Sequence, residues 1–112
     1  MADKDRLGVI RGTLDLLILR TLARSRAMHG VEILESIHGV TNQNVRIEEG
    51  ALYPALHRME RRGWLASTWD VSPKGRRAKY YSLTDEGIAA AEAERERWTR
   101  YVAAVAKLVG DA

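Results

Sequence analysis

The spacing of apolar residues changes from a helical to an extended pattern at Gly63, and this change limits the fold more than any other feature. Before it, apolar residues recur at helical spacing in residues 13–24, 29–40 and 48–62. After it, residues 64–70 and 78–83 are rich in aromatic and β-branched side chains, which is typical of strands. From residue 84 to about 109 the spacing is helical again. The chain is therefore expected to form three helices, a hairpin and a long final helix.

The first two helices are expected to build the core. Thr13 predicts an N-cap for the first helix, and this segment is apolar almost all round, so it should be buried on more than one side. The second helix has Gly30 at its start and Gly39 at its end. Residues 41–44 predict a turn, and residues 45–47 a short extended piece.

The third helix is expected to present a polar and aromatic face to the solvent. It should end at Gly63, and Pro54 is expected in its first turn, so the helix should start no earlier than Glu49 or Gly50. Its core face carries Leu52, Leu56 and Met59. Its outward face carries Tyr53, Pro54, His57, Arg58 and Arg61. Such a face suits a DNA groove.

The hairpin is expected to have a basic tip. Residues 71–77 join its strands, and Gly75 permits a tight turn that gathers Lys74, Arg76 and Arg77. The adjacent Tyr80 and Tyr81 should point to opposite faces of their strand.

The final helix is expected to reach beyond the core. Thr84 predicts its N-cap, and a helix from there to residue 109 would be close to ~40 Å long, more than a domain of this size covers. The element order is that of a winged helix-turn-helix. We therefore predict a mainly α fold with a small β-hairpin: a DNA-binding winged helix-turn-helix domain in residues 1–83 and a C-terminal dimerisation helix in residues 84–112.

Positive charge is concentrated in the middle of the chain. Residues 57–79 contain seven Lys or Arg and two acidic residues, a net charge of +5. Residues 84–112 contain four basic and six acidic residues, a net charge of −2. A basic centre with a separate acidic arm is typical of a nucleic-acid reader, although a solvated surface gives the same counts.

Several function classes lack their residues in this sequence. The chain has no cysteine, and its three histidines are not clustered, so no metal site or cofactor is expected. No nucleophile and base pattern, phosphate-binding glycine loop or His-Glu-x-x-His motif is present, so no catalytic residue is expected. No segment has the apolar length of a membrane span or signal peptide, and we expect a cytoplasmic protein.

The motifs of the third helix and hairpin resemble those of the PadR family. The similar stretches are residues 29–33, 50–60, 62–65, Trp69 and residues 74–87, and the likeness extends over residues 10–109. The single short final helix resembles the compact subfamily. This resemblance implies a dimeric winged-helix repressor that binds double-stranded DNA. Some members release DNA when they bind phenolic acids or flat aromatic drugs.

Nine residues are expected to contact DNA, from the outward helix face and the hairpin. They are Tyr53, Pro54, His57, Arg58, Arg61, Lys74, Arg76, Arg77 and Lys79. The Tyr-Pro pair is expected to have a mixed role, because it also fixes the start of the helix. The cations have the alternative of being solubilising charges.

A homodimer is expected through the final helix. Its seam has residues alternately three and four apart: Ile88, Ala91, Arg95, Trp98, Val102, Val105 and Val109. The first helix is expected to supply the opposing surface, including Leu16 and Leu19.

Trp98 is the candidate effector residue. Large aromatics are unusual in such a seam, and family members that sense drugs are similar at this position. Two facing indoles, rimmed by Arg95 and by Glu92 or Glu94, would accept a planar aromatic effector. Trp98 has the alternative role of packing the interface. For the whole chain, the alternatives are a winged-helix protein–protein interaction module and a marR-type or arsR-type regulator.

Overall fold

The structure, a computed structural model, describes residues 7–8 and 12–110. Residues 1–6, 9–11 and 111–112, which belong to the two expected domains, lie outside the described residues. The helices are α1 (Leu14–Ala23), α2 (Gly30–Val40), α3 (Glu49–Arg61) and α4 (Asp85–Val109). The strands are β1 (Leu7–Gly8), β2 (Met28–His29), β3 (Val45–Arg46), β4 (Leu65–Val71) and β5 (Arg77–Leu83).

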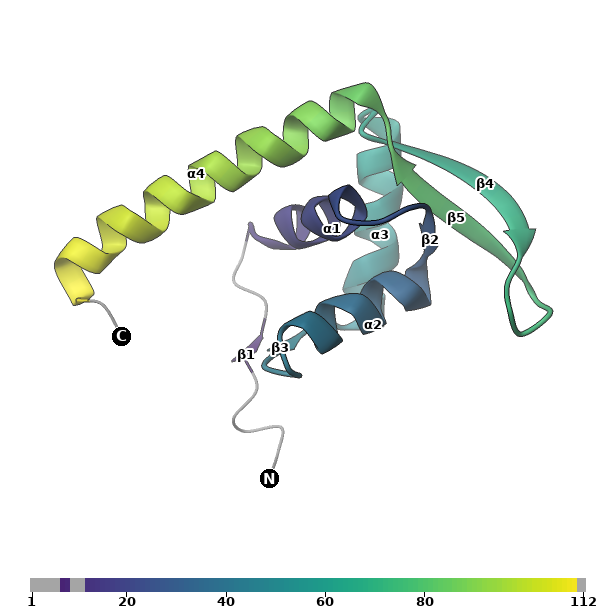
Figure 1. Cartoon of the computed structure of the whole chain (residues 1–112), viewed down its shortest axis with the longest axis horizontal. Helices are drawn as coiled ribbons and strands as arrows, with labels where there is room; N and C mark the ends of the chain where they lie inside the picture. Colours follow the sequence, from purple (N-terminus) through teal and green to yellow (C-terminus); the bar gives the residue numbers. More distant parts are fainter. Residues whose placement is uncertain (1–6, 9–11, 111–112) are drawn as a thin grey trace.

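The predicted mainly α fold with a small β-hairpin is confirmed. Helices α1, α2 and α3 form the body, and the β4–β5 hairpin projects from it as a wing (Figure 1). Helix α4 begins at the base of the wing, passes along α1 and continues beyond the body (Figure 1). Figure 1 therefore shows two projecting parts on one helical core.

The wing belongs to a three-stranded sheet. Strands β4 and β5 pair antiparallel over their full lengths, and β2 adds to the other edge of β5, in the order β2-β5-β4. Strand β3 confirms the predicted extended piece and pairs in parallel with β1. The sequence pattern did not predict β1 or β2, because two residues are too few to show an alternation.

A single apolar core joins all four helices to the sheet. Tyr81 is the buried member of the tyrosine pair, and Tyr80 lies half-buried on the other face of the strand, as their alternation predicted. The buried residues are Ile18, Leu19, Leu22, Ile33, Ile37, Ile47, Leu52, Ala55, Leu56, Met59, Leu65, Tyr81 and Ala91. This core holds α3 with its Leu52 and Met59 face inward, and so turns the predicted polar face to the solvent.

Of two predictions about helix starts, one is confirmed in position and the other is wrong in part. Thr13 is the N-cap residue of α1, as predicted, and its carbonyl accepts from the Leu17 amide (3.0 Å). Its side chain makes no capping hydrogen bond, because its backbone is already near the helical region (φ −103°, ψ −9°) and not in the extended conformation of a typical cap. Helix α3 begins at Glu49, which agrees with the predicted start, but Pro54 is then its sixth residue and lies in the second turn, not the first. Pro54 therefore leaves the Gly50 carbonyl without an amide partner in the helix, at an exposed position where water can bind it.

The junction between the wing and α4 is tightly packed. The Thr84 side chain accepts a hydrogen bond from the Gly87 amide (3.0 Å), which confirms the predicted N-cap. The Thr84 amide and hydroxyl donate to the Trp64 and Gly63 carbonyls. A Cβ on Gly87 would lie 2.0 Å from the Trp64 oxygen, so only glycine permits this approach. The boundary predicted after residue 83 falls here, and the division into two domains stays a prediction.

Candidate nucleic-acid interface

One cleft lies between the exposed face of α3, the start of α2 and the wing. Its volume is about 690 Å³. Six of the nine predicted DNA contacts line it: Tyr53, His57, Lys74, Arg76, Arg77 and Lys79. Pro54, Arg58 and Arg61 are exposed on α3 but do not line the cleft. The structure thus brings the outward helix face and the basic wing to one concave surface.

Tyr53 is held at the mouth of this cleft by close contact with α2. A Cβ added to Gly30 would lie 2.6 Å from Cε1 of Tyr53 and 2.7 Å from its hydroxyl oxygen. Glycine at position 30 therefore lets the phenol ring lie against the first turn of α2. The ring remains 37% exposed and available to a ligand in the cleft.

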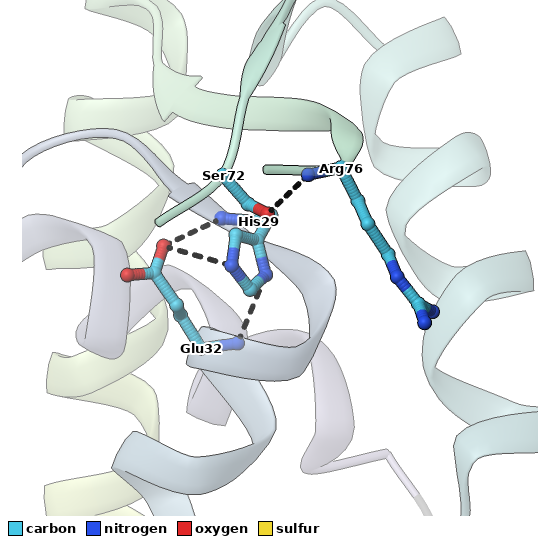
Figure 2. A network of polar contacts seen from close by, with 4 residues as sticks. All are labelled: His29, Glu32, Ser72 and Arg76. Atoms are coloured by element: carbon cyan, nitrogen blue, oxygen red, sulfur yellow. Dashed lines mark hydrogen bonds and ion pairs between the residues drawn. The ribbon is translucent and has the colours of Figure 1, made fainter. Parts of the chain in front are cut away.

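A histidine caps α2 beside the wing, and sequence reasoning did not assign it. The Glu32 amide donates to Nδ1 of His29 (3.3 Å), and the His29 amide donates to Oε1 of Glu32 (3.1 Å), which forms a capping box (Figure 2). The imidazole edge also meets the Tyr80 ring, with centroids 5.3 Å apart. The missed signal was the three-residue spacing of the capping box, with histidine in place of the usual Ser or Thr.

The tip of the wing is a hydrogen-bonded turn, as predicted. The Gly75 amide donates to the Ser72 carbonyl (2.8 Å), and Gly75 has a φ of +79°. The Ser72 amide donates to the Arg76 carbonyl (2.7 Å), and the Arg76 amide donates to the Ser72 hydroxyl (3.3 Å; Figure 2). This turn fixes the backbone from which the exposed Lys74 and Arg76 side chains extend.

Trp69 is a second cleft residue that sequence reasoning did not assign to DNA. It is 54% exposed and lines the cleft from β4, opposite Lys79 in the strand register. The Arg77 guanidinium lies 4.8 Å from the indole centroid, a cation–π contact that orients this cation. The alternation of β4 from the buried Leu65 was the signal that could have placed Trp69 on the inner face of the wing.

The predicted cations differ in whether an acid already compensates them. Arg58 pairs with Asp15 of α1 (2.7 Å), and Lys79 pairs with Glu60 of α3 (3.1 Å). Hydrogen bonds from Ser67 and Lys79 lower the pKa of the Glu60 carboxyl, and the hydrogen bond to Glu60 raises the pKa of the Lys79 ammonium. Among the described residues, Lys74, Arg76 and Arg77 have no carboxylate at ion-pair distance. The wing-tip cations are therefore free to meet a polyanion, as is Arg61 on α3, which likewise has no carboxylate of the described residues at ion-pair distance.

Comparison with known proteins identifies this arrangement. The profile of the family described as Transcriptional regulator PadR-like family matches residues 18–93, which include α2, α3 and the whole wing. The chain belongs to this PadR-like family. Members are transcriptional regulators and not enzymes, so the PadR-like chain is a DNA-binding regulator of transcription.

Solved structures share the PadR-like fold over most of the chain. A transcriptional regulator from Clostridium thermocellum is 33% identical, with a TM-score of 0.80 over 89% of this chain and 96% of that one. A PadR family regulator from Clostridium difficile is 32% identical, with a TM-score of 0.71 over 88% and 98% of the two chains. An uncharacterised protein from Lysinibacillus sphaericus is 39% identical over 85 residues, 75% of this chain and 76% of that one.

A second cleft of the PadR-like chain lies between α1 and α4 and has a volume of about 550 Å³. Trp98 and Tyr101 line it, with ring centroids 6.2 Å apart, opposite Leu16 of α1. Arg95, expected at its rim, pairs with Glu92 (2.8 Å) and does not line it. Of the two glutamates expected at the rim, Glu94 lines the cleft and Glu92 does not. Arg97 and Arg100 lie there in place of Arg95, because α4 turns the flank of residues 94, 98 and 101 toward α1.

Two of the expected dimer residues are enclosed within the chain itself. Leu19 and Ala91 are buried in the core where α1 packs on α4, so they have no surface left for a second chain. Leu16 and Val105 are half-buried. The remaining seam residues are exposed: Ile88, Arg95, Trp98, Val102 and Val109. The exposed apolar surface of α4 also includes two residues that the seam did not include: Tyr101 (62% exposed), at the cleft with α1, and Leu108 (89% exposed), near the end of the helix.

The described residues of the PadR-like chain contain no helix that is both long and apolar enough to cross a membrane. Within the same residues, no three His, Cys, Asp or Glu side chains come together as a metal site.

Proposed function

We propose that this PadR-like regulator binds an inverted-repeat operator as a homodimer and represses transcription there. The observation that supports the proposal most strongly is the shared cleft, which places the outward face of α3 beside the uncompensated cations of the wing. In this proposal the α3 face with Tyr53 and His57 enters the major groove. Lys74, Arg76 and Arg77 contact phosphates or the adjacent minor groove.

The remaining predicted contacts have distinct places in this proposal. Arg61 is exposed at the end of α3 and would contact a phosphate. Arg58 would first have to leave Asp15, and Pro54 would contribute by apolar contact beside Tyr53. A repressor role follows if the bound operator overlaps the promoter and blocks access to it.

The homodimer is proposed from the exposed apolar end of α4. A 12.6 kDa chain that leaves Val102, Leu108 and Val109 in water gains by burying them against a second copy. A two-fold dimer would present two α3 helices to successive major grooves, about one helical turn (~34 Å) apart.

Selection of bound duplexes from a random pool tests this proposal. The expected result is an enriched inverted repeat with half-sites about 10 base pairs apart centre to centre. Sedimentation of the protein at micromolar concentration should show a dimer. A stable monomer, or a protein complex formed with no duplex enriched, would contradict the proposal, and the second result would favour a protein–protein module.

A planar aromatic effector is proposed for the cleft at Trp98. Its two rings and Leu16 provide apolar walls. Arg97 and Arg100 outnumber Glu94 at the rim, and Glu94 already pairs with Arg97 (3.0 Å), so the cleft would favour neutral or anionic planar compounds. Binding would change the separation of the two α3 helices and so weaken operator binding. Trp98 lies beyond the residues that the family profile matches, so this proposal rests on the cleft alone.

A fluorescence titration with planar dyes and phenolic acids tests the effector site. The parent and Trp98→Ala should be compared after sedimentation has shown that the variant keeps the same oligomeric state. The expected result is quenching and DNA release in the parent and neither in the variant. Equal DNA release from both proteins would show that Trp98 only packs the structure.

A further inference from the structure

Glu60 links α3 to both strands of the wing. Its carboxylate, near the end of α3, accepts hydrogen bonds from the Ser67 hydroxyl of β4 (2.5 Å) and from the Lys79 ammonium of β5 (3.1 Å). The Glu60 and Lys79 side chains are only 31% and 28% exposed. The Lys79 ammonium also lies 5.5 Å from the ring centroid of the buried Tyr81. These contacts tie α3, β4 and β5 together beside the cleft that Lys79 and Tyr81 line.

We propose that Glu60 is a positioning residue that sets the angle between α3 and the wing, and that Lys79 acts through Glu60 and does not bind a phosphate. This inference rests on the proposed function, because it assumes that DNA occupies the cleft. It changes the role that the sequence predicted for Lys79, which lines the same cleft as the wing-tip cations.

Charge balance supports this role for Lys79. If the Lys79 ammonium turned to a phosphate, the half-buried Glu60 carboxylate would keep only its hydrogen bond from Ser67 and would face a polyanion without a cation to balance its charge. Lys74, Arg76 and Arg77 carry no such penalty, because no carboxylate of the described residues pairs with them. The Lys79 charge is thus compensated within the protein by Glu60.

A small rotation of the wing at the Glu60 contact would produce a large displacement of its tip. The Glu60 contact reaches β4 at Ser67, and the turn begins five residues later at Ser72. At about 3.3 Å per residue, the tip lies roughly 16 Å beyond the contact. A rotation of ~10° at this point would therefore move the tip by about 3 Å, roughly the length of a hydrogen bond. Fixing the wing at its base decides whether tip cations and α3 reach DNA together.

Removing the pair without changing net charge tests the proposal. Glu60→Gln combined with Lys79→Met should lower affinity for the selected operator about tenfold, comparable with one mismatched base pair. Binding to unrelated duplexes should change by less than about twofold, and the slope of log K against log salt should stay as in the parent. Lys79→Arg as a single substitution keeps an ion pair with Glu60, so this variant should bind the operator with parental affinity.

A matched control is Lys74→Met, which removes an uncompensated cation from the wing tip. It should reduce the salt slope by about 0.9 for both kinds of duplex. If the paired variant also loses about 0.9 while Lys74→Met behaves as expected, Lys79 is a phosphate contact and the positioning role is wrong. If neither variant changes binding, the proposed binding of DNA in the cleft fails.

A thermal unfolding scan of each variant checks that the proteins compared are folded. If the Glu60→Gln, Lys79→Met variant does not fold, the test is made by comparing the operator affinities of Lys79→Arg and Ser67→Ala. Loss of operator affinity in Ser67→Ala alone would support the link, and full affinity in it would contradict the link.

Discussion

Replacing Gly87 by alanine should destabilise the protein through a backbone clash. An added Cβ would lie 2.0 Å from the Trp64 carbonyl oxygen, 3.0 Å from the Trp64 carbonyl carbon and 3.2 Å from a methyl carbon of Leu83. The nearest of these atoms is backbone, so no rotamer change relieves the contact. The first turn of α4 must instead move away from the base of the wing.

The size of the effect follows from three contributions. Overpacking of a close contact typically costs about 1–3 kcal/mol. Displacement of the helix start also weakens the hydrogen bonds that Thr84 donates to the Trp64 and Gly63 carbonyls, each worth about 1 kcal/mol. Alanine regains about 1 kcal/mol because glycine is unfavourable in a helix. The net expectation is a loss of about 2–3 kcal/mol of unfolding free energy.

Chemical denaturation at a fixed protein concentration measures this loss, since association makes stability depend on concentration. Gly39→Ala is the matched control, because Gly39 lies in α2 with open space around its Cβ position. The control should gain about 0.5 kcal/mol. Gly87→Ala with parental stability, within about 0.5 kcal/mol, would refute the argument that this junction cannot yield.

Two further predictions concern α2 and Glu60. His29→Ala should lower the unfolding free energy by about 1 kcal/mol, because the Glu32 amide loses its cap acceptor. His29→Asn should keep most of the parental stability, since Asn is a good cap residue. Equal losses in the two variants, measured by chemical denaturation, would refute the capping role. The second prediction concerns pH: the folded-state pKa of Glu60 is lowered, chiefly by Ser67, so its stabilisation is complete above its ordinary pKa of 4.5 and is lost as pH falls through the lower folded value. The difference in unfolding free energy between parent and Glu60→Gln should therefore be constant from pH 7 to about 5.5 and shrink below 4.5. A difference that grows on acidification would contradict this sign.

Local patterns were sufficient to predict the helices and the wing. The Thr84 cap, the stop at Gly63 and the turn at Gly75 depend on residues close in sequence, and the structure confirms all three. The third strand could not be predicted, because β2 is defined only by pairing with a strand about fifty residues away. Pro54 was expected one turn too early, because a helix that begins at Glu49 or at Gly50 has Pro54 as its sixth or fifth residue, in the second turn.

The sequence predicted which residues form the candidate site better than it predicted the ion pairs among them. The helical periodicity correctly predicted that Tyr53 and His57 face outward, and the density of positive charge indicated the wing tip. Periodicity does not show which cations already have acid partners, because the partners Asp15 and Glu60 come from other elements or other turns. In the same way, the seam of α4 did not reveal that its first turns, including Ala91, are covered by α1 of the same chain.

The salt dependence of DNA binding tests the central claim, that the cleft between α3 and the wing holds double-stranded DNA. Affinity for a selected duplex should be measured over a range of salt for the parent and for a variant with Arg76 and Arg77 both replaced by alanine. The parent should lose affinity steeply as salt rises, and the variant should have a slope smaller by about 1.8, since each lost phosphate contact removes about 0.9. A variant with the parental slope and affinity would show that DNA does not occupy this cleft.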